Sequence, residues 1–128
     1  HSENCLNHFM TFLPNGDVYP CNRFTDYNDF KIGNICSDTF SDILNSERRK
    51  TLIRRIANNI PECRSCEYKS YCKGGCMNHA YEFYGAVNKP DYYCKSFFSI
   101  FKDINEYINN SIQKSKINNF NYGTIKGV

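Results

Sequence analysis

Residues 63–94 read CRSCEYKSYCKGGCMNHAYEFYGAVNKPDYYC and hold five of the chain's eight cysteines, at spacings C-x2-C-x5-C-x3-C-x17-C. Thiolates this close together repel one another unless a cation lies between them, so metal binding is the leading interpretation. Gly74 and Gly75 allow backbone N–H groups to come close to inorganic sulfide. The stretch therefore predicts a small domain organised around metal-thiolate sites, with iron-sulfur as the first choice.

Two other uses of these cysteines stay open at this point. Zinc takes four thiolates in structural sites, but zinc ribbons usually separate two C-x2-C pairs by about 15–20 residues. Only five residues separate Cys66 from Cys72. Disulfides are the third interpretation, in pairings that spacing cannot choose between.

Length, composition and net charge limit the class of protein. The chain has 128 residues, of which 41% are hydrophobic, and a net charge of +3. We therefore expect one small metal-stabilised domain, residues 1–113, with a flexible tail over 114–128. The charge is too mild to indicate nucleic acid, and neither a signal peptide nor a membrane-spanning run is present in the sequence. We expect a reducing, cytoplasmic setting, and the missing initiator Met suggests a piece of a longer protein.

The pattern along the chain predicts an α+β fold. Asn15-Gly16 predicts a β-hairpin over residues 8–21, with paired residue numbers summing to 31, so that Cys21 lies opposite Met10. A loop rich in Asp and Asn follows, and residues 31–35 predict a short extended piece. A helix over residues 39–45 is expected to be capped by Ser37 or Asp38.

Three further helices are expected. One runs from the cap Ser46 through Ile56, with its basic residues mostly exposed to solvent: Arg48, Arg49, Lys50, Arg54 and Arg55. A short helix follows Cys76 over residues 77–85. An amphipathic C-terminal helix begins near Lys95, and its apolar stripe predicts core packing: Phe97, Phe101, Ile104, Ile108 and Ile112.

Seven cysteines and one glycine together resemble the SPASM domain, the auxiliary-cluster domain at the C-terminus of many radical S-adenosylmethionine enzymes that modify peptides or proteins. The order is Cys5-x10-Gly16-x4-Cys21, a gap of 41 residues, and then the stretch from Cys63 to Cys94. The segments GDVYPC (16–21), KIGNI (31–35) and CKGGC (72–76) also look like that family. The resemblance covers residues 5–94.

The resemblance implies two 4Fe-4S clusters with interleaved ligands. Cys63, Cys66, Cys72 and Cys94 would hold the cluster farther from the active site, and Cys5, Cys21 and Cys76 would bind the nearer one. The fourth ligand of the nearer cluster would be Cys36, a cysteine upstream of this chain, or an open position for substrate. His8 and His79 are expected to pack or to form hydrogen bonds and not to bind metal.

The resemblance also implies a role. The chain has no C-x3-C-x2-C triad, the mark of the S-adenosylmethionine-binding cluster, so it is not expected to be catalytic alone. The S-adenosylmethionine site and the catalytic barrel would lie in an upstream domain, the partner of this one. The clusters would transfer electrons or bind a peptide or protein substrate, with no nucleic-acid or membrane partner. The alternative is a structural zinc-binding interaction module that uses the basic helix from Ser46.

Overall fold

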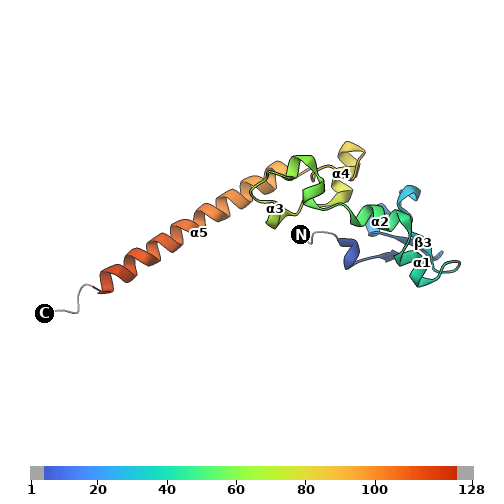
Figure 1. Ribbon diagram of the computed structural model, residues 1–128, viewed down its shortest axis with the longest axis horizontal. Coiled ribbons are helices and arrows are strands. Elements are labelled where there is room, and N and C mark those ends of the chain that lie inside the picture. Colours follow the sequence, from blue (N-terminus) through green and yellow to red (C-terminus); the bar gives the residue numbers. More distant parts are fainter. Residues whose placement is uncertain (1–4, 124–128) are drawn as a thin grey trace. The chain divides into compact units, whose positions relative to one another are not determined.

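The computed structural model describes the backbone of residues 5–123 and the side chains of residues 5–114 (Figure 1). The chain divides into two compact units, residues 1–94 and 95–128, which are described separately below. The first unit contains a small sheet and short helices, as the α+β prediction expects. Its elements are η1 (Cys5–Asn7), β1 (Thr11–Phe12), β2 (Asp17–Tyr19), η2 (Asn22–Phe24), η3 (Asn28–Phe30), β3 (Gly33–Asn34), α1 (Phe40–Leu44), α2 (Glu47–Ile53), η4 (Ala57–Asn59), η5 (Pro61–Cys63), α3 (Lys69–Cys72) and α4 (Met77–Tyr84).

The predicted hairpin is present, but its register differs by one residue. Strands β1 and β2 pair Thr11 with Tyr19 and Phe12 with Val18, so partner numbers sum to 30 and not to 31. The cause is a longer turn, in which the Gly16 N–H donates to the Leu13 carbonyl and Gly16 has a φ of +87°. A positive φ at the last loop residue is typical of hairpins with three-residue loops.

The extended piece at residues 31–35 is confirmed as strand β3, which pairs antiparallel with β2. The sheet therefore has the order β1-β2-β3. Helix α1 follows, and its N-cap is Thr39 and not Ser37 or Asp38. The Thr39 side chain accepts from the Asp42 N–H while the Asp42 carboxylate accepts from the Thr39 N–H, which is a capping box.

Helix α2 begins as predicted after Ser46, whose hydroxyl accepts from the Arg49 N–H. It ends at Ile53, three residues before the predicted end. The expectation that its basic residues face solvent is wrong for Arg55, which is only 6% exposed. The Arg55 guanidinium can be buried because each of its three nitrogens donates to a backbone carbonyl, as described below.

The main core joins residues that are far apart in sequence. Leu6, Tyr19, Leu52 and Met77 pack with Phe24 and Phe30, both from the stretch that we expected to be a polar loop. Those two rings stack with centroids 4.3 Å apart. Cys5 and Cys21 pack against this cluster while remaining partly exposed. The core therefore positions two of the predicted metal ligands at its edge.

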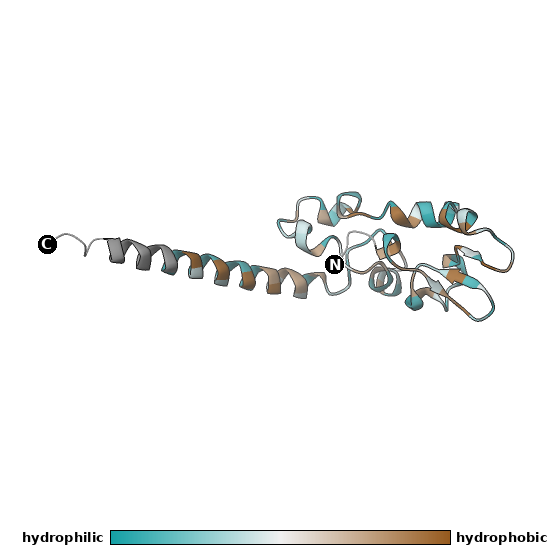
Figure 2. Ribbon diagram, turned by 90° about the horizontal axis from the view of Figure 1, so that it is seen from below, coloured by the Kyte–Doolittle hydropathy of each residue, from teal (hydrophilic) through white to brown (hydrophobic). Residues whose placement is uncertain are grey.

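The second unit is helix α5, which begins with Cys94, the last residue of the first unit, and ends at Gly123. It passes the predicted boundary at residue 114 without a break, and residues 124–128 lie outside the described part of the chain. The predicted burial of the apolar stripe is wrong for its three isoleucines, since Ile104, Ile108 and Ile112 are 47–49% exposed, whereas Phe97 and Phe101 are partly buried. Figure 2 shows apolar and polar residues alternating along this helix. Over the described residues, no helix is both long enough and apolar enough to cross a membrane.

Candidate metal centres

Four thiols from the cysteine-rich stretch lie in one neighbourhood. Helix η5 ends at Cys63, whose carbonyl accepts from the Cys66 N–H at 3.2 Å, and α3 ends at Cys72. The pKa of Cys63 is raised to about 11, first by burial and then by the charges of Cys94, Cys72 and Cys66 in that order. Burial also raises the pKa of Cys94, with Cys66 as the next cause. These four residues are the ones the family resemblance assigns to the distant cluster.

A second group of thiols comes from three separate parts of the chain. Burial raises the pKa of Cys5, and the charges of Cys21 and Cys76 act in the same direction. Burial likewise raises the pKa of Cys21, with Cys76 as a further cause. Cys5 lies in η1, Cys21 follows β2, and Cys76 is the N-cap residue of α4. The resemblance assigns the same three residues to the nearer cluster.

The chemistry of both groups suits a cationic iron-sulfur core. All eight cysteines are unpaired thiols. Burial is the largest cause that raises the pKa of five of them, and a bound metal reverses that preference for the protonated form because the thiolate is the ligand. The five are Cys5, Cys21, Cys63, Cys72 and Cys94. Within the described residues, no three Cys, His, Asp or Glu side chains are arranged to hold one single metal ion. In a cubane cluster each thiolate binds its own iron, so its four ligands stand farther apart than around one ion.

Residues 73–75 connect the two groups, because Cys72 belongs to one and Cys76 to the other. All three have positive φ: 54° at Lys73, 82° at Gly74 and 66° at Gly75. The Gly74 N–H hydrogen-bonds the Cys72 thiolate and so opposes the effect of burial on its pKa. This is the close backbone approach that the glycine pair predicts.

Asp91 fixes the backbone of one ligand from each group. Its side chain is 1% exposed, and Oδ2 accepts from the Cys76 N–H at 2.7 Å. Its own carbonyl accepts from the Cys94 N–H at 2.9 Å, and its N–H donates to the Gly74 carbonyl. No local motif in the sequence pointed to this residue, because the groups it joins are up to 17 residues away.

His79 extends this network toward the Cys76 sulfur. Arg23 Nη1 donates to His79 Nε2 at 2.6 Å and lies 3.8 Å from the Cys76 Sγ. Since Nε2 accepts, the ring proton belongs on Nδ1, which donates to Asp91 Oδ2 at 3.1 Å. His79 therefore forms hydrogen bonds in this structure, as expected, and links Arg23 to Asp91 beside Cys76.

The structure does not bring Cys36 to either group. Cys36 is exposed and follows β3, and its sulfur would lie 2.7 Å from a Cβ placed on Gly16. Gly16 precedes β2 and Cys21 follows it, which separates them by roughly 16 Å of extended chain. Cys36 thus lies at the opposite end of the strand from Cys21.

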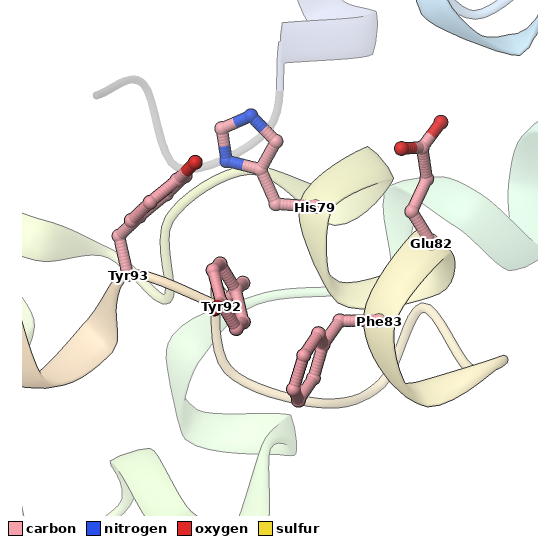
Figure 3. Close-up of a pocket in the computed structure, with 5 residues that line it drawn as sticks. All are labelled: His79, Glu82, Phe83, Tyr92 and Tyr93. Atoms are coloured by element: carbon pink, nitrogen blue, oxygen red, sulfur yellow. The ribbon is translucent and has the colours of Figure 1, made fainter.

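A surface cavity of about 240 Å³ opens beside the His79 network (Figure 3). Its walls come from α4 and from the loop before Cys94, and consist of His79, Glu82, Phe83, Tyr92 and Tyr93. Phe83 and Tyr92 lie with ring centroids 4.1 Å apart, and the Glu82 carboxylate accepts from the Tyr27 hydroxyl at 3.2 Å. The cavity presents aromatic faces and one oriented carboxylate.

Comparison with curated proteins finds partial relatives. A cysteine-type anaerobic sulfatase-maturating enzyme of Clostridium novyi is 30% identical over 102 residues, which are 77% of this chain and 27% of that protein. A serine-type anaerobic sulfatase-maturating enzyme of Bacteroides thetaiotaomicron is 30% identical over 97 residues, 73% of this chain and 23% of that protein. This chain thus spans about a quarter of the length of these relatives.

Two solved structures share the fold of this chain, and a family model matches its sequence. A structure described as native anSMEcpe with bound AdoMet aligns over 82% of this chain and 29% of its own, with a TM-score of 0.63 and 24% identity, which shows a shared fold. Another, described as native anSMEcpe with bound AdoMet and Kp18Cys peptide, aligns over 77% of this chain and 27% of its own, with a TM-score of 0.57 and 25% identity. The SPASM model, described as an iron-sulfur cluster-binding domain, matches residues 4–67, half of the sequence. The chain therefore belongs to the SPASM family of iron-sulfur cluster-binding domains.

Proposed function

We propose that this chain holds two 4Fe-4S clusters and serves as the accessory domain of a radical S-adenosylmethionine enzyme that modifies a protein or peptide. Cys63, Cys66, Cys72 and Cys94 hold one cluster, and Cys5, Cys21 and Cys76 bind the other. When bound, such clusters supply one-electron transfer. The protein provides the ligands, their hydrogen bonds and the charges around them.

The observation that carries the proposal is the interleaving of the two thiol groups. Cys72 interacts with one group and Cys76 with the other, although only three residues separate them. A single cluster or a single zinc site would gather neighbouring cysteines into one set. Here neighbouring cysteines in the sequence belong to different sets. Metal bound to both sets would therefore hold the hairpin and the cysteine-rich stretch together in one folded unit.

The class of reaction follows from the relatives. The two curated relatives are named as sulfatase-maturating enzymes, and both aligned structures carry AdoMet in their descriptions. One of those structures also includes a peptide. We therefore propose that this domain works beside an S-adenosylmethionine-binding domain and that the enzyme acts on a protein substrate, as sulfatase maturation requires.

The second group supplies three thiols, so one iron needs a further ligand. The position of Cys36 at the far end of β2 favours the two alternatives, a cysteine from outside this chain or an open site for substrate. The three thiols are all partly exposed, which leaves room for such a ligand.

Metal analysis of anaerobically reconstituted protein tests the proposal. We expect about eight irons and eight acid-labile sulfides per chain, about half of each in Cys66→Ala or Cys21→Ala, and the full amount in Cys36→Ala. Cys66→Ala should also melt at a lower temperature, because cluster binding is coupled to folding. Cys36→Ala is the matched control, a cysteine outside both groups.

Other outcomes would contradict the proposal in different ways. Zinc bound in preference to iron when both metals and sulfide are supplied would favour the interaction-module alternative. Absence of free thiols, with a melting temperature indifferent to chelators, would favour a disulfide scaffold. An unchanged melting temperature in Cys66→Ala would argue against coupling between cluster binding and folding.

A further inference from the structure

Arg55 is a buried cation whose hydrogen bonds all go to backbone carbonyls in two loops. Nη2 donates to the Gly74 carbonyl at 2.9 Å and Nη1 to the Gly75 carbonyl at 3.1 Å. Nη2 also donates to the Lys89 carbonyl at 2.9 Å, and Nε donates to the Val87 carbonyl. The guanidinium thus joins the link between Cys72 and Cys76 to the segment that leads to Cys94.

The same side chain lies within electrostatic range of both thiol groups. The charges of Cys76 and Cys63 act on it most strongly among the thiols, and Cys5 acts as well. Cys63 belongs to the distant group, whereas Cys76 and Cys5 belong to the nearer one. The hydrogen bonds of Arg55 to the Gly74 and Gly75 carbonyls also place it on the three-residue link between Cys72 and Cys76, one cysteine of each group. One cation therefore faces ligands of both sites.

Carbonyl oxygens satisfy the donors of Arg55 but do not neutralise its charge. A buried charge is unfavourable unless an opposite charge lies near it, and arginine stays protonated when buried. Asp91, which is buried and also acts on Arg55, supplies one negative charge. Cluster-bound thiolates would supply more, on both sides of the guanidinium.

We propose that Arg55 is a positioning residue shared by both clusters: it fixes the Gly74-Gly75 link between them, and its charge raises both reduction potentials. This inference rests on the proposed function, because it requires a cluster in each thiol group. Net charge near a cluster is one of the properties that set its potential, and a nearby cation favours the reduced, more negative state.

The test is a redox titration of the reconstituted chain, followed by electron paramagnetic resonance. In Arg55→Met we expect both clusters to shift to more negative potentials and the melting temperature to fall. Arg55→Lys keeps the charge but cannot reach all four carbonyls, so we expect near-native potentials and a lower melting temperature. Arg54→Met is the matched control, because the neighbouring arginine is exposed and the charge change is the same.

The outcomes separate this inference from the function on which it rests. A wild-type chain without iron and sulfide overturns both. With iron and sulfide bound in the wild type, potentials in Arg55→Met that match those of Arg54→Met overturn the role of Arg55 alone. A shift confined to one cluster, or an equal shift in Arg55→Lys and Arg55→Met, also overturns the shared-cation role.

Discussion

At Gly75, backbone conformation and space both exclude a side chain. Its φ is +66°, and a Cβ added there would lie 2.4 Å from the Cβ of Asp91. Asp91 cannot move away freely, because its carboxylate holds the backbone of Cys76. The glycine thus allows Cys76, from one thiol group, to pack against the loop that leads to Cys94, from the other.

We expect Gly75→Ala to destabilise the protein strongly and to lower its iron content. The alanine would carry the cost of positive φ, about 1–2 kcal/mol, and would also displace Asp91. Gly85→Ala is the matched control, since Gly85 has a φ of +67° with nothing within 4 Å of the added Cβ. Urea unfolding with iron analysis would measure both, and equal losses in the two variants would contradict the role of the Asp91 contact.

At the residue scale, the sequence predicted the grouping of the thiols better than the residues that surround them. Seven cysteines fall into the two groups that the family resemblance implied, because fixed spacings are visible in a single chain. Asp91 and Arg55 were missed, since the hydrogen bond between Asp91 and Cys76 and the bonds from Arg55 to Gly75 and Lys89 join positions 15–34 residues apart, which no local pattern indicates. Burial of Arg55 also contradicts the solvent-facing pattern expected for a basic helix.

Among the elements, the small sheet depends on a polar cluster around Asp17. Its carboxylate contacts Lys31, and it accepts from Asn34 Nδ2 at 2.8 Å and from Asn15 Nδ2 at 3.0 Å. Asn15 lies in the turn before β2, Lys31 lies just before β3, and Asn34 lies in β3. The cluster therefore holds the hairpin turn and the third strand in one register.

The polar cluster around Asp17 makes the stability of the protein sensitive to acid. The hydrogen bond from Lys31 is the largest cause that lowers the pKa of Asp17, followed by that from Asn34. A depressed folded-state pKa adds stability above the unfolded value of about 3.9, and this contribution is lost as pH falls through the lower folded value. We expect Asp17→Asn to lose less stability than wild type between about pH 5 and pH 3.

Urea unfolding at each pH would measure the difference. Asp26→Asn, at an exposed position outside the cluster, is the control and should follow the wild-type curve. Any iron lost in acid would be lost from all three proteins, so the contribution of Asp17 is the difference between their free energies of unfolding at each pH. Parallel stability curves for Asp17→Asn and wild type would show that the polar cluster around Asp17 does not contribute to the acid sensitivity.

The local sequence pattern predicted α2, α4 and β3, but it did not predict the 3-10 helices, whose aromatic residues recur every three positions. Phe24, Tyr27 and Phe30 recur every three residues, the period of a 3-10 helix, within a stretch whose Asp and Asn content suggested a loop. The structure has two 3-10 helices there, and Phe24 is 0% exposed. The hairpin register was missed because Asn15-Gly16 identifies a turn but not the length of its loop.

For the whole molecule, the division at Cys94 assigns all the cysteines to the first unit and nearly all of the long helix to the second. Both thiol groups lie within residues 5–94, whereas the three isoleucines of the α5 stripe are about half exposed. A periodic apolar stripe shows which face of a helix avoids water, and it does not identify what covers that face. For this reason the sequence predicted the helix but could not predict whether its stripe joins the core of this chain.

We therefore expect a chain that ends after Phe101 to keep both clusters. The last ligand is held from within the first unit, because the Cys94 N–H donates to the Asp91 carbonyl and Asp91 is fixed by Gly74 and Cys76. Two turns of α5 would remain to continue the backbone beyond Cys94. Iron, sulfide and melting temperature should match the full chain, whereas a chain ending after Asp91 should lose about half of its iron along with Cys94. Loss of iron already in the chain ending after Phe101 would mean that residues 102–128 belong to the metal-binding unit, contrary to the division at residue 94.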